Sequence, residues 1–257
     1  MDGYHYIKVF LIAFTAILLV YYLLPAWMSY MIFYRWENEK WQNSQIQKTG
    51  HTKSSIKREI AWSISTVLIF SILATTGVYW INQGYTKVYF EIPDRGWPYL
   101  VLSILIYIVL HDSYFYWVHR LMHWRPVFKW VHKTHHLSHT PSPFASLSFS
   151  PAEAVLQFGI NLIMIFLVPL HPLAIGIFAI YNTVINTAGH TGIEIVPAFF
   201  VRNWFFKHGL TVTHHDMHHS HMNCNYGLCF DFWDRIMGTI NEHYKQTYME
   251  LKSREHG

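Results

Sequence analysis

Histidine supplies most of the side chains that could do chemistry in this sequence. The chain has 19 histidines in 257 residues; seven fall between His111 and His139, and seven more between His190 and His221. Imidazole is the commonest protein ligand for transition metals, and clustered neutral imidazoles suit zinc, copper, iron and nickel. The crowding of histidine in two short windows therefore predicts a metal site built from both.

Three histidine boxes define this prediction. They read His119-Arg-Leu-Met-His123, His132-Lys-Thr-His135-His136 and His215-Asp-Met-His218-His219. Because residues three and four apart lie on one face of a helix, each box should point two or three rings the same way. An ion with an open catalytic position rarely takes more than about three protein ligands. The eight box histidines are therefore too many for one ion and suit two.

Further histidines extend the candidate ligand set. His190, in the pattern Asn186-x-x-x-His190, is a ninth candidate, and His111, eight residues before the first box, is a tenth ligand or a supporting group. The register of the third box is ambiguous, because His214 and His218 are also four apart. The weaker candidates are His139, His208, His214 and His221. The isolated histidines, expected to be ordinary packing residues, are His5, His51, His171, His243 and His256.

The surroundings of the boxes favour redox chemistry over hydrolysis. A zinc hydrolase would carry a general base beside its ligands, as in His-Glu-x-x-His, but no glutamate lies within any box. A site at the end of membrane helices would meet lipids, whose C–H bonds require a redox metal and oxygen. Two irons can share the electrons that split dioxygen. The carboxylates available to orient the ligating imidazoles are Asp112, Asp216, Glu153, Glu194, Asp231 and Asp234.

The composition is that of a membrane protein. Hydrophobic residues make up 52% of the chain and charged residues 13%, whereas soluble domains carry about 25% charged residues. The net charge of +4 comes without a basic stripe, so we expect no nucleic-acid partner. The two cysteines, Cys224 and Cys229, cannot form a disulfide framework and are expected to be packed thiols.

Hydropathy predicts an all-α integral membrane protein with a single membrane domain over 1–257. Three apolar stretches are long enough to span a bilayer, and we expect the first to be retained rather than cleaved as a signal peptide. Two shorter ones, broken at Pro169-Leu-His-Pro172, suggest a helical hairpin that enters the membrane and returns. The three spans are 10–33, 60–81 and 97–118, and the hairpin is 154–168 and 172–186. Within the domain, 1–96 holds the N-terminal helices and loops, 97–240 the catalytic region, and 241–257 a charged tail expected to be loose.

Charge predicts the topology. Residues 35–59 carry six Lys/Arg and 82–96 carry two, so the positive-inside rule places 35–59 in the cytoplasm. The third span then returns to that side near His119, and the hairpin keeps the chain after Asn186 there. All boxes are thus expected in a helical cap on the cytoplasmic face of a bacterial inner membrane or the endoplasmic reticulum.

The order of these motifs resembles the fatty acid hydroxylase/sterol desaturase superfamily over residues 100–240. The resemblance lies in the three boxes and in their companions. Within that superfamily, the long first box and the stretch from Thr140 to Ser146 are most similar to the sterol C5-desaturase branch. The companion motifs are His111-Asp112 before the first box, Thr140-Pro-Ser-Pro-Phe-Ala-Ser146, His190-Thr-Gly-Ile-Glu194, Asn225-Tyr226-Gly227, Trp233-Asp234-Arg235 and Gly238-Thr239.

The resemblance implies a membrane oxygenase with two histidine-bound metal ions, iron when active, with zinc as an alternative in isolated protein. Such enzymes hydroxylate or desaturate lipids with O2 and electrons from a separate donor, which could be cytochrome b5-like, a ferredoxin or a reductase. Members commonly carry another short box before the last. Here Asn186 stands at its first position, so an asparagine oxygen, a water or His111 would complete the ligand set.

Three other interpretations stay open at this point. A zinc transporter or store predicts ionisable residues at mid-membrane in several helices, where only His111 and His171 come close. A haem protein would need far fewer histidines. A metal-dependent membrane hydrolase would need a carboxylate within a box. The substrate could be a sterol, a fatty acyl chain, a ceramide or an ether lipid, and Phe115, Tyr116, Phe144, Phe149 and Phe158 are candidates to line its path.

Overall fold

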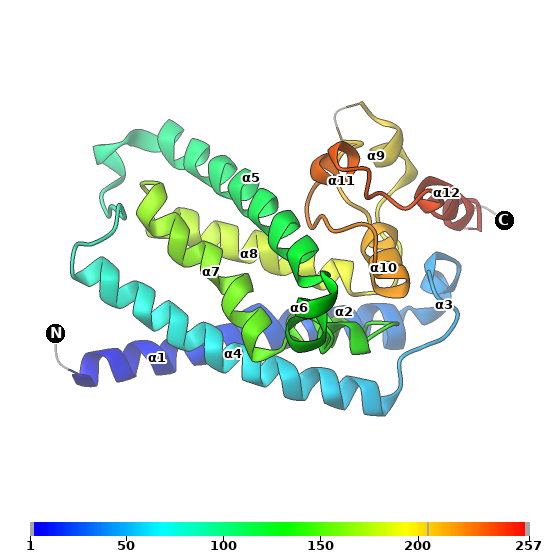
Figure 1. Ribbon diagram of the computed structural model, residues 1–257, viewed down its shortest axis with the longest axis horizontal. Helices are drawn as coiled ribbons and strands as arrows, with labels where there is room; N and C mark the ends of the chain where they lie inside the picture. The colour runs from blue at the N-terminus through cyan, green and yellow to red at the C-terminus, as the bar shows by residue number, and fades with distance from the viewer. Residues whose placement is uncertain (1–2, 205, 255–257) are drawn as a thin grey trace.

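Helices make up all the regular structure of the described chain, as predicted. A computed structural model describes residues 3–204 and 206–254, and within them the only strand-like pairings are two isolated bridges. The long helices form an elongated bundle, with the short helices other than α6 gathered toward the end opposite the N-terminus (Figure 1). The long ones are α1 (Gly3–Leu18) continuing into α2 (Leu24–Met31), α4 (Lys53–Asn82), α5 (Gly96–Met122), α7 (Pro151–Leu167) and α8 (Pro172–Gly189). The short ones are α3 (Asn38–Trp41), α6 (Arg125–Val131), α9 (Ala198–Arg202), α10 (Val212–His221), α11 (Phe232–Ile236) and α12 (Tyr244–Arg254).

Four helical stretches of the described chain are long and apolar enough to cross a membrane. They are Gly3–Trp36, α4, α5 and α8. The first three contain the predicted spans with longer ends. The predicted hairpin is present as α7 and α8, but α8 is an 18-residue helix rather than a short one, whereas α7 is shorter. Sequence reasoning ended the helix too early at residue 186.

Proline and capping residues set the helix ends around the hairpin. Ser150 caps α7 by accepting from the Glu153 amide, with Pro151 in the first turn. His171 caps α8, where its Nδ1 accepts from the Leu173 amide, with Pro172 in the first turn. Proline is tolerated there because the first-turn amides have no partner within the helix. The proline-marked break therefore lies between two helices, as the predicted hairpin required.

Helix α4 buries many small and polar side chains, while the outer surface of the bundle exposes apolar ones. Helix α4 buries Ser63, Thr66, Ser71 and Gly77, while α1 and α5 expose residues such as Ile12, which is 69% accessible. In water this pattern would be unfavourable, but lipid tails are as apolar as leucine, and small residues let helices approach closely. A Cβ at Gly77 would lie 3.2 Å from Leu162 of α7.

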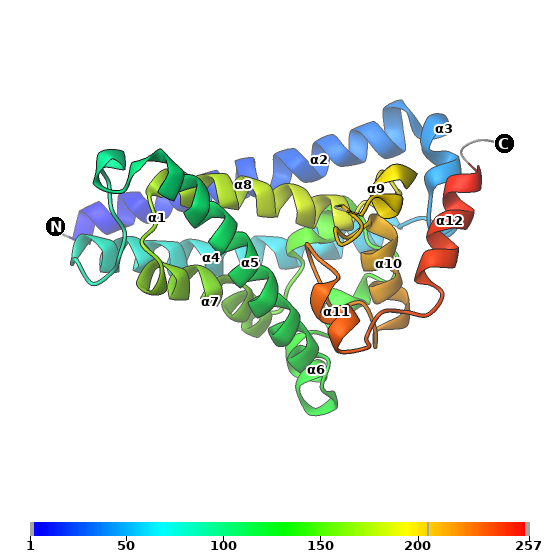
Figure 2. The same cartoon turned by 90° about the horizontal axis from the view of Figure 1, so that it is seen from above.

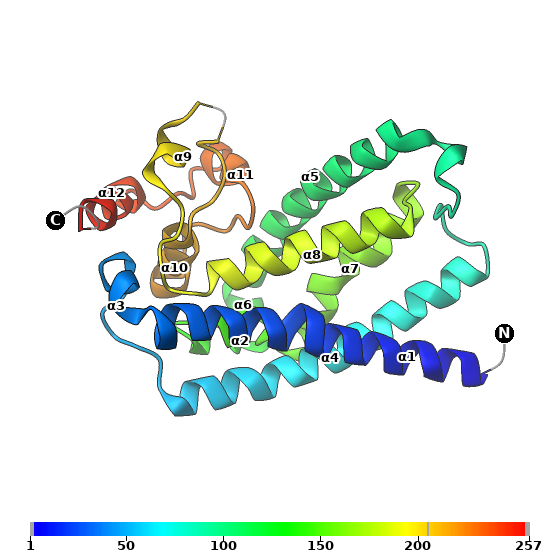
Figure 3. The same ribbon diagram turned by 180° about the vertical axis from the view of Figure 1, so that it is seen from behind.

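The remaining packing brings the bundle and the short helices together. Helix α1 packs on α4, and α8 lies between α5 and α2 (Figure 3). At the far end of α5, α6 projects from the bundle (Figure 2). The loop after α3 reaches the histidine region, since the Ile46 amide donates to the Gly192 carbonyl (3.0 Å) and Gln47 Nε2 donates to Asp216 Oδ1 (2.9 Å). The basic loop and the boxes thus lie at the same end, as charge predicted.

The C-terminal segment is folded as far as Arg254, the last described residue. Helix α12 buries Tyr248 and Leu251 completely or nearly so, and Tyr244 Oη bonds Thr211 Oγ1 (3.1 Å) at the start of α10. The expectation of a loose tail was wrong for the described residues, because Tyr244, Tyr248 and Leu251 recur at helical spacing on one face, which packs beside α10. His256 lies outside the described residues.

Candidate metal centre

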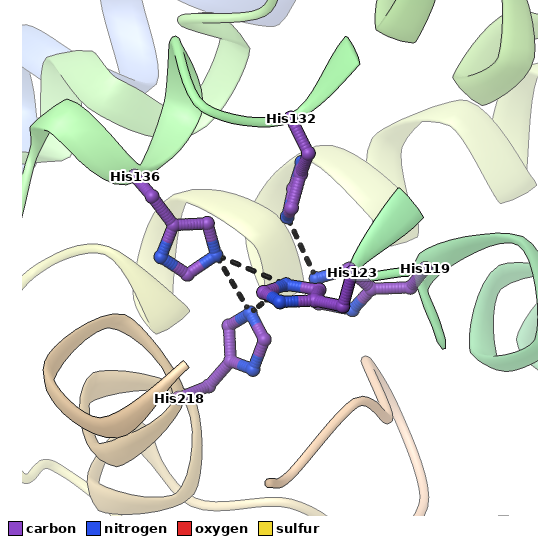
Figure 4. A group of neighbouring side chains, drawn as sticks. All are labelled: His119, His123, His132, His136 and His218. Carbon is purple, nitrogen blue, oxygen red and sulfur yellow. Dashed lines mark hydrogen bonds between the residues drawn. The ribbon is translucent and has the colours of Figure 1, made fainter. Parts of the chain in front are cut away.

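The histidine boxes converge into two adjacent clusters. The first cluster consists of His119, His123, His132, His136 and His218, and the second of His135, His190, His215 and His219. Within each cluster the candidate ligand atoms all lie within 4.8 Å of one another. Figure 4 shows the first cluster, with rings from α5, from the segment after α6 and from α10 pointing toward a common centre.

Helix geometry explains how each box divides between the clusters. In the second box, His132 and His136 are four apart and join the first cluster, while His135 joins the second. In the third box the roles reverse: His215 and His219 join the second cluster and His218 the first. Consecutive residues point about 100° apart in α10, which holds His218-His219, and about 120° apart in the 3-10 turn His135–Leu137. Each His-His pair therefore reaches two neighbouring centres. The rings of His136 and His219, from different clusters, lie 5.0 Å apart.

The nitrogen separations fit a shared ion. In the first cluster, Nε2 atoms are 3.0 Å apart for His119 and His132 and 3.0 Å for His136 and His218. In the second cluster, the distance from His190 Nε2 is 3.3 Å to His135 and 3.2 Å to His215. Ligands about 2.1 Å from one ion in tetrahedral or octahedral geometry lie about 3.0–3.4 Å from each other. The donor set and its spacing therefore fit one transition-metal ion per cluster.

Burial keeps the imidazoles in the form that binds metal. Eight of the nine cluster histidines are buried, and His123 is partly exposed. Burial lowers the pKa of His136 to about 3 and that of His190 to about 4. The pKa values of His135, His215 and His219 are also lowered well below the usual range, first by burial and then by neighbouring histidines. At neutral pH these rings are uncharged and offer a lone pair.

Several rings are oriented through Nδ1. His119 Nδ1 donates to the Tyr226 carbonyl (2.8 Å) and His218 Nδ1 to the Cys224 carbonyl (2.7 Å). His132 Nδ1 donates to Glu153 Oε1 (2.7 Å) and His190 Nδ1 to the Asn186 carbonyl (2.7 Å). Such bonds fix the tautomer so that Nε2 faces the metal.

A tight loop supplies two of these acceptors. The Asp234 carboxylate accepts from the backbone amides of Tyr226 (2.9 Å) and Gly227 (2.8 Å). A Cβ at Gly227 would lie 2.5 Å from the Phe230 carbonyl oxygen, so only glycine fits. The Asn225-Tyr226-Gly227 and Asp234 motifs thus act together, because they hold the Cys224–Tyr226 carbonyls against the first cluster.

The other carboxylates hold the scaffold rather than the rings. Glu194 accepts from the Thr213 amide (2.8 Å) and hydroxyl (2.6 Å) in the first turn of α10, where an anion is favoured by the helix dipole. Asp112 accepts from the Cys229 amide (2.9 Å), and Asp231 pairs with Arg235. Of the six carboxylates proposed from sequence, Glu153 is the one that accepts a hydrogen bond from a cluster ring within the described chain.

Nine of the ten predicted ligands come together, and His111 does not join either cluster. His111 instead lines a small cavity beside both clusters, and its Nδ1 is buried without a hydrogen-bond partner among the described residues. Asn186 contributes its carbonyl to His190, while its Nδ2 donates to the Ser146 carbonyl (2.7 Å). The four weaker candidates also stay outside the clusters; they are His139, His208, His214 and His221. Since His215 and not His214 joins a cluster, the third box is His215-Asp-Met-His218-His219.

Sequence reasoning missed the carbonyls of Cys224 and Tyr226 and the role of Asn186 in orienting His190. Every residue has a carbonyl, so nothing in the sequence marks these three. The signal that was present is the glycine after Tyr226, which indicates a close backbone approach.

A membrane-type helical bundle that ends in two polyhistidine clusters defines a histidine-box membrane metalloprotein. A sequence profile described as fatty acid hydroxylase matches residues 104–239, and the chain belongs to that family. It is 32% identical to a rat lathosterol oxidase over 225 residues, which are 86% of this chain and 71% of the relative.

Plant and fungal relatives carry related descriptions. A Delta(7)-sterol-C5(6)-desaturase of Nicotiana tabacum is 28% identical over 194 residues, 72% of this chain and 66% of the relative. A Delta(7)-sterol 5(6)-desaturase of Gibberella zeae is 28% identical over 187 residues, 73% of this chain and 56% of the relative. No solved structure matches the chain. The predicted superfamily, its sterol desaturase branch and a lipid-acting oxidoreductase class are confirmed.

Proposed function

We propose that this protein is a di-iron oxygenase that desaturates or hydroxylates a sterol, using O2 and electrons from a separate protein. The observation that carries the proposal is the pair of adjacent clusters, one of five and one of four histidines, each with donor spacing suited to one ion. The sterol class is supported by relatives named lathosterol oxidase and Delta(7)-sterol 5(6)-desaturase.

The first and second clusters would each hold one iron ion through the nine histidines named above. Two irons there would supply the redox chemistry with dioxygen that an unactivated C–H bond requires. The protein's own contribution is positional. Nδ1 acceptors aim the rings, burial excludes water, and Phe115 and Phe149, with the histidines, line the cavity that meets the clusters.

The electron donor is proposed to dock beside His123, the partly exposed cluster histidine. The neighbouring side chains Arg125, Lys129 and Lys133 are exposed, and no acidic residue occurs between 113 and 152. An acidic donor, whether cytochrome b5-like, a ferredoxin or a reductase, would be attracted there. Because the basic loop 35–59 lies at the same end, we assign this face to the cytoplasm.

Anaerobic purification followed by metal analysis tests the centre. We expect about two irons per chain and no haem absorption band; one zinc per chain with no iron would overturn the proposal. Incubation with a reductase system, O2 and lathosterol should give a product lighter by two hydrogens or heavier by one oxygen. Turnover that persists without O2 would contradict an oxygenase and favour a hydrolase.

A further inference from the structure

A chain of cavities leads from the clusters into the bundle. The metal-side cavity, of about 60 Å³, is bounded by His119, His135 and His190 among others. A middle cavity of about 380 Å³ shares Phe70, Leu147, Asn161, Asn182 and Asn186 with it. A far cavity of about 400 Å³ shares Phe158, Asn161, Pro172 and Ile175 with the middle one. Together they trace a path within the bundle between α4, α7 and α8.

Polarity falls along this path. Besides histidines, the metal-side cavity is lined by Glu153, Gln157, Asn161, Asn182 and Asn186. The far cavity is lined mainly by aliphatic residues, and its polar members include Asn82 and Tyr107. An elongated amphiphile would therefore lie with its polar end beside the clusters and its hydrocarbon end in the far cavity, because an unmatched buried polar group costs free energy.

Most of the polar groups near the clusters are already engaged. Asn161 Oδ1 accepts from Tyr107 Oη (2.6 Å) and its Nδ2 donates to the Phe158 carbonyl (3.2 Å). Asn186 Nδ2 is taken by Ser146. Among the residues that line the metal-side cavity, two buried oxygens have no hydrogen-bond partner within the described chain: Glu153 Oε2, whose carboxylate already accepts from His132 through Oε1, and Asn182 Oδ1. Asn182 is the uncharged one of the two. Asn182 lines both the metal-side and the middle cavity. Rotation about its side-chain bonds can point the amide oxygen into either cavity.

His111 offers the complementary group from α5. Its Nδ1 is likewise buried and unpaired within the described chain, and it lines the metal-side cavity. Its ring lies 4.9 Å from that of Phe178, which precedes Asn182 by one helical turn on α8. A hydroxyl both donates and accepts, so one hydroxyl between Asn182 and His111 would satisfy both.

We propose that the sterol binds hydroxyl end first, with its hydroxyl held by Asn182 and His111 and its hydrocarbon end in the far cavity. Asn182 and Asn186 share one face of α8, and His190 follows four residues later as its C-cap, so the hydroxyl lies within about three turns of a metal ligand. The carbons presented to the metals are then those close to the hydroxyl. This inference rests on the proposed function, since it assumes a sterol substrate.

Binding to the full-length, zinc-loaded protein tests this orientation without turnover. Lathosterol and its 3-deoxy analogue would compete with a fluorescent sterol for the wild type, Asn182→Leu and Asn82→Leu. We expect the wild type to prefer lathosterol by roughly tenfold, the usual effect of one buried hydrogen bond. Asn182→Leu should remove that preference by weakening lathosterol alone, with zinc content unchanged. Asn82→Leu, the same change at the far end, should preserve it.

The other outcomes are distinguishable. Equal binding of both sterols by the wild type would overturn the orientation while leaving the proposed function intact. Loss of preference in Asn82→Leu but not in Asn182→Leu would mean the sterol lies the other way round. Displacement by neither sterol would overturn both the orientation and the sterol substrate.

Discussion

The two histidine clusters differ in how the protein orients them. In the first cluster, His119, His132 and His218 each donate Nδ1–H to a protein acceptor. In the second, only His190 has such an acceptor within the described chain. Buried Nδ1 atoms without a hydrogen-bond partner within the described residues number three in the second cluster, on His135, His215 and His219, and one in the first, on His136.

This difference indicates two degrees of preorganisation. Acceptors that fix a ring lower the entropy lost when a metal binds and usually raise affinity about 10–100-fold. The first cluster also has one more histidine than the second. We therefore expect the first cluster to be formed largely by the protein, and the second to depend more on the ion itself.

The largest expected effect comes from deleting one ligand in each cluster. His218→Ala and His135→Ala should both abolish turnover and lower metal content from about two ions to about one. Metal analysis and lipid mass spectrometry provide the measurements. Replacement of the exposed His243 by alanine is the control. Retained turnover in either ligand variant would mean that the site has been misplaced, and loss of both ions would mean that the clusters are not independent.

Gly227→Ala should damage the first cluster through its scaffold. The new Cβ would lie 2.5 Å from the Phe230 carbonyl and 2.9 Å from Asp234 Oδ2, and overpacking of this kind costs about 1–3 kcal/mol. Thermal unfolding in detergent should show that loss, with metal released chiefly from the first cluster. Gly50→Ala is the matched control, because nothing lies within 4 Å of its Cβ. An unchanged melting temperature in Gly227→Ala would argue against the tight loop.

Chelation of the wild type tests whether the first cluster holds its ion more tightly than the second. Under a competing chelator, one ion should leave at least about tenfold more slowly than the other, because of the difference in preorganisation. His135→Ala, which impairs the second cluster, should keep the slow phase, and His218→Ala should lose it. If His218→Ala keeps the slow phase and His135→Ala loses it, the second cluster holds its ion longer. Hydrogen bonds to Nδ1 would then not determine which ion leaves first.

Glu153→Gln should reduce the difference between the release rates of the two ions. Glutamine keeps an acceptor oxygen for His132 but removes the charge, so first-cluster affinity should fall about tenfold with the second unchanged. The measurement is the ratio of the two release rates, with the exposed Glu242→Gln as control. An equal fall at both clusters would place Glu153 in a general structural role.

Several parts of this centre could be predicted from residues alone. Spacing in the boxes predicted which rings share a helical face, and the same spacing appears in the pairs His132/His136 and His215/His219. Apolar length predicted the three long spans. Tyr244, Tyr248 and Leu251 carried a helical period too, but charged residues between them masked it, so α12 was not expected.

What the amino-acid sequence determined by itself is the chemistry: enough imidazoles for two ions, and helices that end beside them in a membrane. Only the tertiary structure decided the division into five and four, the exclusion of His111 and the choice of Nδ1 acceptors. Ligand identity depends on side-chain type, which is local. Which histidines share a cluster depends on where α5, α8 and α10 converge. Which atoms accept from Nδ1 depends largely on backbone carbonyls, which every residue possesses.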